Sequence, residues 1–125
     1  MSFDWSEYLI LAQELAGQAT RPSSQEAKLR SAISRAYYAA FCKARNHLRD
    51  KEHHRIPSGG EAHQYVQNQF KDSPDKARRD VGANLNRLRI RRTKADYEDR
   101  VTKLPRTTEY AVKVAERIVS NLRRL

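Results

Sequence analysis

The sequence predicts an all-α protein, and three observations indicate this fold class. Apolar residues recur at intervals of three and four along most of the 125 residues, which is the spacing of one face of an α-helix. Glycine and proline are scarce, with four of each, and they cluster at a few points that divide the chain into five segments. No segment shows the sustained apolar and polar alternation of a half-buried strand. We therefore expect a single domain over residues 1–125, built as an antiparallel bundle of four to five helices.

The first two predicted helices span about residues 4–19 and 23–50. Asp4-x-x-Glu7 and Ser23-x-x-Glu26 resemble capping boxes at their starts. The second helix has the longest apolar face in the chain, which consists of Leu29, Ile33, Ala36, Tyr37, Ala40, Phe41, Ala44 and Leu48. A polar loop over residues 51–60 follows it.

The third helix is predicted over about residues 58–70, where Ser58-x-x-Glu61 forms another predicted cap. The fourth begins at Ser73 with Pro74 in the first helical position, where a missing N–H costs nothing. Its apolar face consists of Val81, Leu85, Leu88, Arg92 and Ala95. The fifth is predicted over about residues 107–125.

The composition excludes several classes of protein. The longest apolar runs fall far short of the roughly 20 residues that a membrane span needs, and acidic residues stand where an export signal would be basic, so we expect a cytoplasmic protein. The single cysteine, Cys42, offers no disulfide and no metal-site spacing, and we expect it in the core. Phosphate-loop, nucleophile-elbow and His-Glu-x-x-His patterns are missing, which argues against ordinary nucleotide-binding enzymes and esterases. We expect no metal and no other cofactor.

The positive charge of the chain is unevenly distributed. The net charge is +10, yet residues 1–27 contain four acidic residues and one arginine. Residues 76–106 contain eleven basic and four acidic residues. A localised basic stripe indicates a polyanionic partner, although a solvated, soluble surface would explain the same count.

A polar group interrupts the apolar face of the fourth predicted helix. Arg92 lies four residues after Leu88 and therefore points toward the core or an interface, and Asp96 is one turn further on, where it can pair with Arg92. Tyr97 adds a phenol that can donate and accept hydrogen bonds. Two interpretations stay open: a structural salt bridge with Tyr97 as packing, or an anion-binding or RNA-cleaving pair. The spacing favours Arg92 over Arg91 as the residue that faces this site but does not decide between them.

Adjacent tyrosines on the second predicted helix occupy different faces. Tyr37 continues the apolar face, and Tyr38 lies about 100° around the helix at its edge, near Ser34. Because a buried tyrosine hydroxyl needs a partner, we expect packing with one hydrogen bond. The Glu52-His53-His54 run is interpreted as a solvated loop and not as a metal site.

Three blocks of this sequence resemble the HEPN family. Residues 31–41, with Tyr37-Tyr38, resemble the central helix of the branch that has a paired tyrosine there. His63 followed by Phe70 resembles the short third helix of that branch, and Leu88-Arg89-x-x-Arg92-x-x-Ala95-Asp96-Tyr97 is similar to its Arg-x-x-Ala-Asp-Tyr signature. The resemblance extends from about residue 27 to residue 122, with the blocks in the family's order.

The resemblance implies a helical bundle that usually dimerises and that belongs to prokaryotic toxin or defence systems. Many HEPN proteins are metal-independent ribonucleases with an Arg, a spacer of four to six residues and a His, and the dimer brings two copies of this motif into one cleft. Many are encoded beside a small nucleotidyltransferase antitoxin, which in some pairs adenylylates a tyrosine just after the motif. Here Asp96 stands where that His is expected. An Asp can act as a base or orient an Arg at neutral pH, but it is a poor general acid.

Three functions follow as hypotheses. The first is a toxin-like or defence-associated HEPN protein that acts on RNA through a dimer cleft as a metal-independent ribonuclease. The second is a non-catalytic HEPN module that binds a nucleotidyltransferase or another partner, and the third is a basic helical nucleic-acid binder. For the first, the candidate residues are Arg92, Asp96 and Tyr97 for catalysis, Arg35, Arg89, Arg91 and Lys94 for RNA binding, and Tyr38 and His63 in support.

Overall fold

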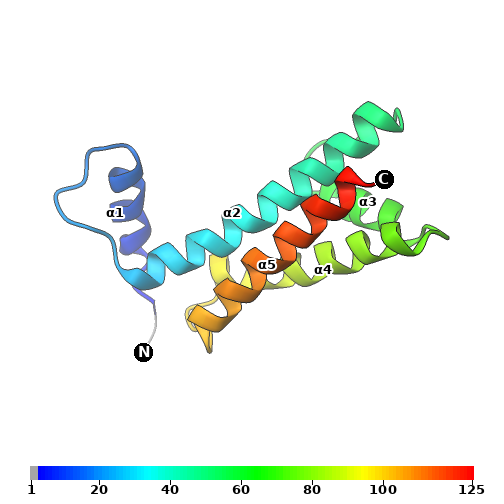
Figure 1. Cartoon of the computed structure of the whole chain (residues 1–125). Helices are drawn as coiled ribbons and strands as arrows, with labels where there is room; N and C mark the ends of the chain where they lie inside the picture. Colours follow the sequence, from blue (N-terminus) through cyan, green and yellow to red (C-terminus); the bar gives the residue numbers. More distant parts are fainter. Residues whose placement is uncertain (1–2) are drawn as a thin grey trace.

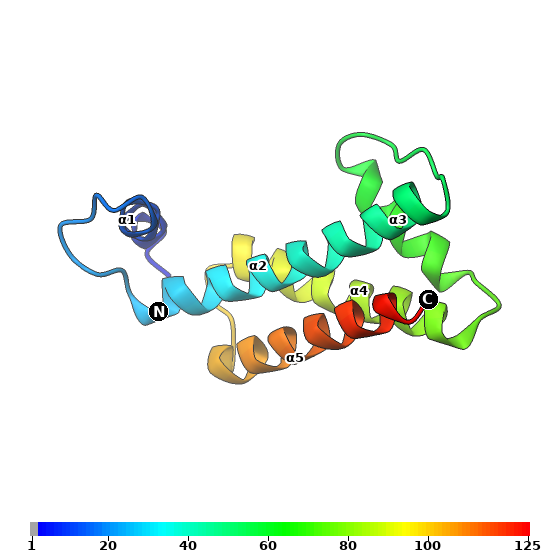
Figure 2. The same cartoon turned by 45° about the horizontal axis from the view of Figure 1, so that its top comes forward.

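The computed structural model describes residues 3–125, and over that range the chain is helical and contains no strand, as the apolar spacing predicts. The helices are α1 (Ser6–Leu15), α2 (Gln25–Asn46), α3 (Glu61–Lys71), α4 (Lys76–Tyr97) and α5 (Leu104–Arg123), and a π-helical turn, η1 (His47–Lys51), extends α2. The long helices α2, α4 and α5 pack together, with α1 at one end of the bundle and α3 at the other (Figure 1). In both views α4 runs antiparallel to α2 and α5, which run in the same direction (Figure 2).

The core of the bundle is formed by the predicted apolar faces of α2, α3, α4 and α5. Its largest buried apolar members, each less than 2 % exposed, are Tyr37, Phe70, Ile33, Leu48, Leu88, Ile118, Val66 and Val81. Cys42 is partly buried against this core, as predicted. None of the helices in the described range has both the length and the apolar character needed to cross a bilayer.

The start of α2 differs by one residue from the prediction. Ser24, and not Ser23, is the N-cap, and its Oγ accepts a hydrogen bond from the Ala27 N–H at 3.1 Å. The free N–H groups of Ser23 and Ser24 donate to the carboxylates of Glu14 and Glu7, at 2.8 Å and 2.7 Å. The predicted Ser23-x-x-Glu26 box was therefore wrong, because acidic side chains from α1 take the place that Glu26 was expected to fill.

The starts of the other helices also need correction. Helix α1 is shorter than predicted and has Trp5 as its N-cap. Gly60, which has no side chain, precedes α3, so Ser58 is not its cap. Asp75 caps α4 by accepting from the Arg78 N–H at 3.2 Å, which places Pro74 before the helix. Helix α5 begins at Leu104, three residues earlier than predicted, because the proline that follows is accommodated in the first turn.

A buried arginine joins α2 to the end of α4. Arg30 is 0 % exposed, and its guanidinium donates to the carbonyl oxygens of Ala95, Glu98 and Asp99 at 2.9, 2.7 and 3.1 Å. Its Nε donates to Glu26 at 3.1 Å. Because the last carbonyls of a helix have no partner within the helix, this side chain acts as the C-terminal cap of α4.

The N-terminal segment packs against the same arginine and not against the main core. The rings of Phe3, Trp5 and Tyr8 lie edge to face, with centroids 5.0 to 5.5 Å apart. The Arg30 guanidinium lies 4.3 Å from the centroid of the Phe3 ring, and Trp5 Nε1 donates to Asp99 Oδ1 at 2.9 Å. Helix α1 is thus attached through a second, small cluster of aromatic side chains.

Candidate functional site

The side chains of the three sequence blocks meet on one side of the bundle. Tyr37 and Tyr38 come from α2, His63 from the first turn of α3, and Arg89 and Arg92 from α4. The ring of Tyr38 lies between the other two blocks, because its centroid is 5.1 Å from the Arg92 guanidinium carbon and 5.9 Å from the His63 ring. Helix packing therefore brings together residues that are up to 55 positions apart in the sequence.

Arg92 and Asp96 lie at the centre of this group as an ion pair. The distance from Arg92 Nε to Asp96 Oδ2 is 2.8 Å, and both side chains are about four-fifths buried. The N–H at Nε is buried and is not directed along a hydrogen bond, so the contact is mainly one of charge. Asp96 Oδ2 accepts a hydrogen bond from Ser34 Oγ, at 3.3 Å. Asp96 thus holds the Arg92 guanidinium against the face of Tyr38.

His63 is partly buried beneath the tyrosine pair. Its Nδ1 lies 2.6 Å from the Tyr37 hydroxyl, and its ring stacks on Phe41 with centroids 4.4 Å apart. Burial lowers the pKa of His63 below its ordinary value, and the positive charges of Arg89 and Arg92 lower it further. His63 is consequently neutral at pH 7, with a reference pKa near 6.5 already below that pH. Burial also raises the pKa of Tyr37 to about 12, so its phenol stays protonated.

Tyr97 and Arg89 occupy the two ends of the group. Tyr97 is the last residue of α4 and is 69 % exposed, and its ring centroid lies 5.7 Å from the Arg92 guanidinium carbon. Arg89 Nη1 donates to Gln64 Oε1 at 3.3 Å, which links α4 to α3 beside His63. The group therefore has two arginines, a neutral histidine and an exposed phenol within one surface region.

Three of the predicted RNA contacts lie elsewhere. Arg91 stacks on Tyr110 of α5, with its guanidinium carbon 4.3 Å from the ring centroid. Lys94 lines the same α5-facing side of α4 as Arg91. Arg35 lines a groove between α2 and α5 that Ala36 and Val119 also border. Since consecutive residues on a helix point about 100° apart, Arg91 and Lys94 face away from Arg92, and Arg35 lines the side of α2 that faces α5. Arg92, and not Arg91, is the residue that faces the candidate site.

Tyr37 was expected to pack in the core with one hydrogen bond, and the structure shows that the partner of its hydroxyl is His63. The signal was present, because a buried phenol needs a polar partner, but the sequence does not say which one. Over residues 3–125, no group of three or more His, Cys, Asp or Glu side chains is placed to hold a metal ion.

Comparison with known proteins identifies the family of the chain. A family model described as HEPN domain matches residues 12–125, which includes α2 to α5 and every residue of the candidate site. Neither the curated proteins nor the solved structures give a match. The match covers most of the chain and agrees with the all-helical bundle, so the protein belongs to the HEPN domain family.

Proposed function

We propose that this protein is a toxin-like or defence-associated HEPN ribonuclease that acts on RNA in the cytoplasm, with His63 and Arg92 as its central residues. The observation that carries the proposal is the position of His63. The family's usual histidine is replaced by Asp96, but α3 places a different histidine beside the Tyr38 ring, which the Arg92 guanidinium also contacts. An Arg and a neutral His are thus both present, although they come from different helices.

The proposed reaction is attack of a ribose 2′-hydroxyl on the adjacent phosphate. With the Nδ1 proton of His63 directed to Tyr37, the lone pair on Nε2 is free to accept the proton of the 2′-hydroxyl. The 2′-oxygen then forms a bond to phosphorus, the bond to the 5′-oxygen breaks, and the 5′-oxygen takes a proton from solvent. The products are a 2′,3′-cyclic phosphate and a 5′-hydroxyl. Arg92, with Arg89 beside it, stabilises the negative charge on the phosphate oxygens, and Asp96 positions Arg92.

The proposed ribonuclease is a homodimer in which two copies of the chain form one cleft. The candidate site is open to solvent on the side of Tyr97, and a second copy of the chain would place a second Arg and His across a shared cleft. Light scattering on the purified protein measures this directly, and we expect the mass of a homodimer. A small nucleotidyltransferase that binds this dimer and modifies Tyr97 is the partner that the family resemblance suggests.

A second candidate function is supported by the ion pair itself. Asp96 lies 2.8 Å from Arg92 and offsets part of the charge that would otherwise meet a phosphate. This arrangement favours a non-catalytic module in which the same surface binds a protein partner. Under this alternative the partner co-purifies with the protein, and no RNA is cleaved. The basic nucleic-acid binder would instead hold RNA in a salt-dependent manner that does not require Arg92.

The first experiment compares cleavage by the wild type, His63→Gln, Arg92→Ala and Arg91→Ala, without metal and on structured and single-stranded RNA. Arg91→Ala is a matched control, because it removes the same charge one residue away from a side chain that faces α5. We expect the first two variants to lose about a hundredfold or more in rate and the control to lose little. Mass spectrometry should find the 2′,3′-cyclic phosphate.

The pH dependence gives an independent readout of the proposed base. A histidine that must be neutral to accept a proton becomes inactive once it is protonated, and the pKa of His63 is lowered. We therefore expect the rate to stay constant from pH 7 down to a lower pH than an unperturbed histidine would allow, and to fall only below it. Equal cleavage by wild type and Arg92→Ala would indicate a contaminating nuclease and would contradict the proposal, as would no cleavage by either.

A further inference from the structure

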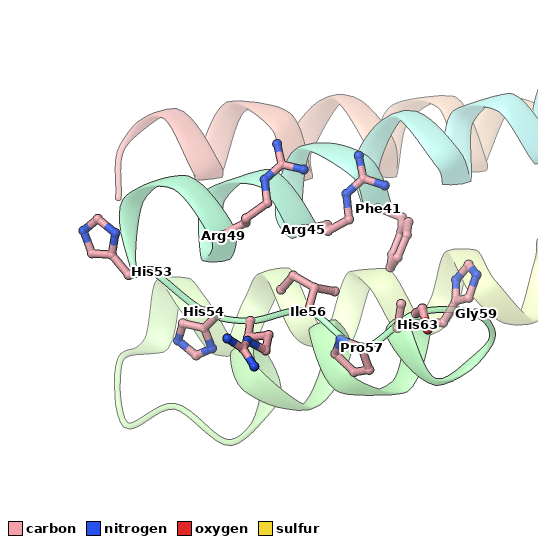
Figure 3. A pocket seen from close by; sticks show the side chains of 12 residues that line it. Phe41, Arg45, Arg49, His53, His54, Ile56, Pro57, Gly59 and His63 are labelled. Atoms are coloured by element: carbon pink, nitrogen blue, oxygen red, sulfur yellow. The ribbon is translucent and has the colours of Figure 1, made fainter.

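A pocket adjoins the candidate site on the side away from Arg92. It has a volume of about 770 Å³, and one wall is formed by Phe41 and Arg45 of α2 with Arg49 of η1. The loop between η1 and α3 forms the opposite wall (Figure 3). His63 borders both this pocket and the group around Tyr38, so the two sites are continuous at that residue.

The loop that forms the second wall is fixed in place. The predicted solvated run Glu52-His53-His54 is only partly solvated, because Glu52 bonds to His47 at 3.0 Å and pairs with Arg78. His54 donates its backbone N–H to the Leu48 carbonyl at 2.9 Å, and its Nδ1 lies 2.7 Å from the Tyr65 hydroxyl.

Two further features shape this wall. His53 has a left-handed backbone with φ of 59°, which is uncommon for a residue other than glycine. Ile56 packs against the main core. Because the loop is tied to the bundle by these contacts, the pocket exists before any ligand arrives, and binding need not include the cost of ordering the loop.

The rim of the pocket is strongly basic. Arg45, Arg49 and Arg55 line it together with His53, and none of its twelve lining residues is acidic. Arg49 is paired with Asp50, which lies outside the pocket. Arg45 makes one hydrogen bond through Nε to Asn46, and in the described range its terminal nitrogens and the whole Arg55 guanidinium have no protein partner. Arg45 and Arg55, one from each wall, thus have guanidinium groups that the protein does not neutralise.

The floor of the pocket is apolar and aromatic. It is lined by Phe41, Ile56, Pro57 and Ala62, and the His63 ring stacks on Phe41 at an interplanar angle of 21°. Phe41 is only 6 % exposed and is covered by His63, so the aromatic ring that remains partly exposed at the floor is that of His63. An apolar floor beneath a basic rim fits a ligand that has both a phosphate and a ring. Proteins that bind single-stranded nucleic acid combine these two features, because the positive charges follow the backbone and the aromatic rings stack on the bases.

We propose that this pocket binds one nucleotide unit, with its phosphate at the basic rim to which Arg45 and Arg55 belong and its base or ribose over the floor beside His63. This inference rests on the proposed function, because the shared residue His63 places the nucleotide next to the bond that would be cleaved. The pocket volume lies within the range of about 300 to 1,000 Å³ that small-ligand sites usually have. The occupant is most naturally part of a single-stranded RNA, since double-stranded RNA keeps its bases stacked inside the helix.

The test uses the full chain and a labelled single-stranded oligoribonucleotide with 2′-O-methyl groups, which cannot react by 2′-hydroxyl attack. The dissociation constant is measured by fluorescence anisotropy for the wild type, for Arg45→Ala/Arg55→Ala and for Arg106→Ala/Arg117→Ala. The last pair is a control of equal charge, because both arginines are exposed on α5 and neither lines the pocket. Thermal melts show whether each variant remains folded.

We expect the Arg45→Ala/Arg55→Ala pair to weaken binding about tenfold or more, and to reduce the slope of log K against log salt by about 0.7 for each lost phosphate contact. The control pair should have a much smaller effect. Equal effects of the two pairs, or no effect of either, would overturn the inference. Adenosine monophosphate and inorganic phosphate then serve as competitors. Displacement of the oligoribonucleotide by adenosine monophosphate but not by inorganic phosphate supports a site that binds a whole nucleotide. Equal displacement by inorganic phosphate means that the pocket binds only an anion, and it overturns the proposal that the apolar floor contacts a base or ribose.

Binding and cleavage measurements together distinguish a wrong pocket assignment from a wrong ribonuclease proposal. If unmodified RNA is not cleaved but binding still depends on Arg45 and Arg55, the pocket stands and the ribonuclease proposal is wrong. If Arg92-dependent cleavage is found and the Arg45→Ala/Arg55→Ala pair changes neither the dissociation constant nor KM, the pocket inference alone is wrong.

Discussion

Arg91 and Arg92 are neighbours in the chain but lie against different helices. Arg92 is held by Asp96 beside Tyr38, whereas Arg91 stacks on Tyr110. Arg30 shows the same dependence on helix face in a stronger form, because it lies on the apolar face of α2 and is completely buried. Three side chains of identical chemistry therefore have three roles, and the helix face on which each one lies decides which role it has.

Arg30 is predicted to be the most important charged residue for stability. Arg30→Ala removes four hydrogen bonds and leaves the carbonyls at the end of α4 without a partner, so we expect the free energy of unfolding to fall by on the order of 3 kcal/mol. Urea denaturation measures this change. Arg35→Ala, on an exposed position of the same helix, should change it by less than about 0.5 kcal/mol. Similar values for the two variants would contradict the structural role of Arg30.

The contact between α3 and α4 depends on a glycine inside a helix. Gly82 is buried within α4, and a Cβ at this position would lie 2.7 Å from Lys71 Cα and 3.0 Å from Lys71 Cβ, at the end of α3. The backbones of the two helices therefore approach closely only because residue 82 has no side chain. This approach sets the position of α3, and through it the position of His63.

Gly82→Ala should destabilise the protein although alanine is the better helix former. The intrinsic preference for alanine is about 1 kcal/mol, but the clash with backbone atoms cannot be relieved by a side-chain rotation, and overpacking usually costs about 1 to 3 kcal/mol. We expect a net loss in the free energy of unfolding, measured by thermal or urea denaturation. Gly60→Ala, where nothing lies within 4 Å of the new Cβ, is the control. A gain in stability for Gly82→Ala would refute the close approach.

The whole molecule contains two hydrophobic clusters of very different size. The main core joins α2 to α5, whereas Phe3, Leu11 and Ala27 form the second cluster with Trp5 and Tyr8 against it. Leu9 and Leu15 of α1 are each 62 % exposed. Helix α1 is thus an appendage that is held by Arg30 and a few polar contacts, and most of it precedes the residues that the family model matches.

Native-state hydrogen exchange should therefore separate α1 from the rest of the bundle. Amides of α1 are expected to exchange at least about tenfold faster than the central amides of α2 and α5, because local opening of a small cluster costs less free energy than global unfolding. Mass spectrometry of peptic fragments resolves the two regions. Equal protection of α1 and α5 would mean that the two clusters unfold together.

The sequence by itself determined the fold class, the five helices and the identity of the buried faces. These features depend on a periodic pattern of apolar side chains. The pattern can be recognised from the sequence even when the predicted start of a helix is wrong by a few residues. The helix ends were less predictable, because two or more neighbouring residues can each serve as the N-cap of a helix. The donors at Ser23 and Ser24 are satisfied by Glu7 and Glu14, from a helix that comes earlier in the chain.

Only the tertiary structure decided which candidate residues form the site. The sequence indicated Arg92, Asp96 and Tyr38, but it could not show that His63 lies beside them or that Arg35, Arg91 and Lys94 face other helices. The physical reason is that a helix turns by about 100° per residue, so the direction of a polar side chain depends on how its helix packs against the others. The end of α3 packs against α4 at Gly82, and this close contact is one of the features that position α3 and its histidine.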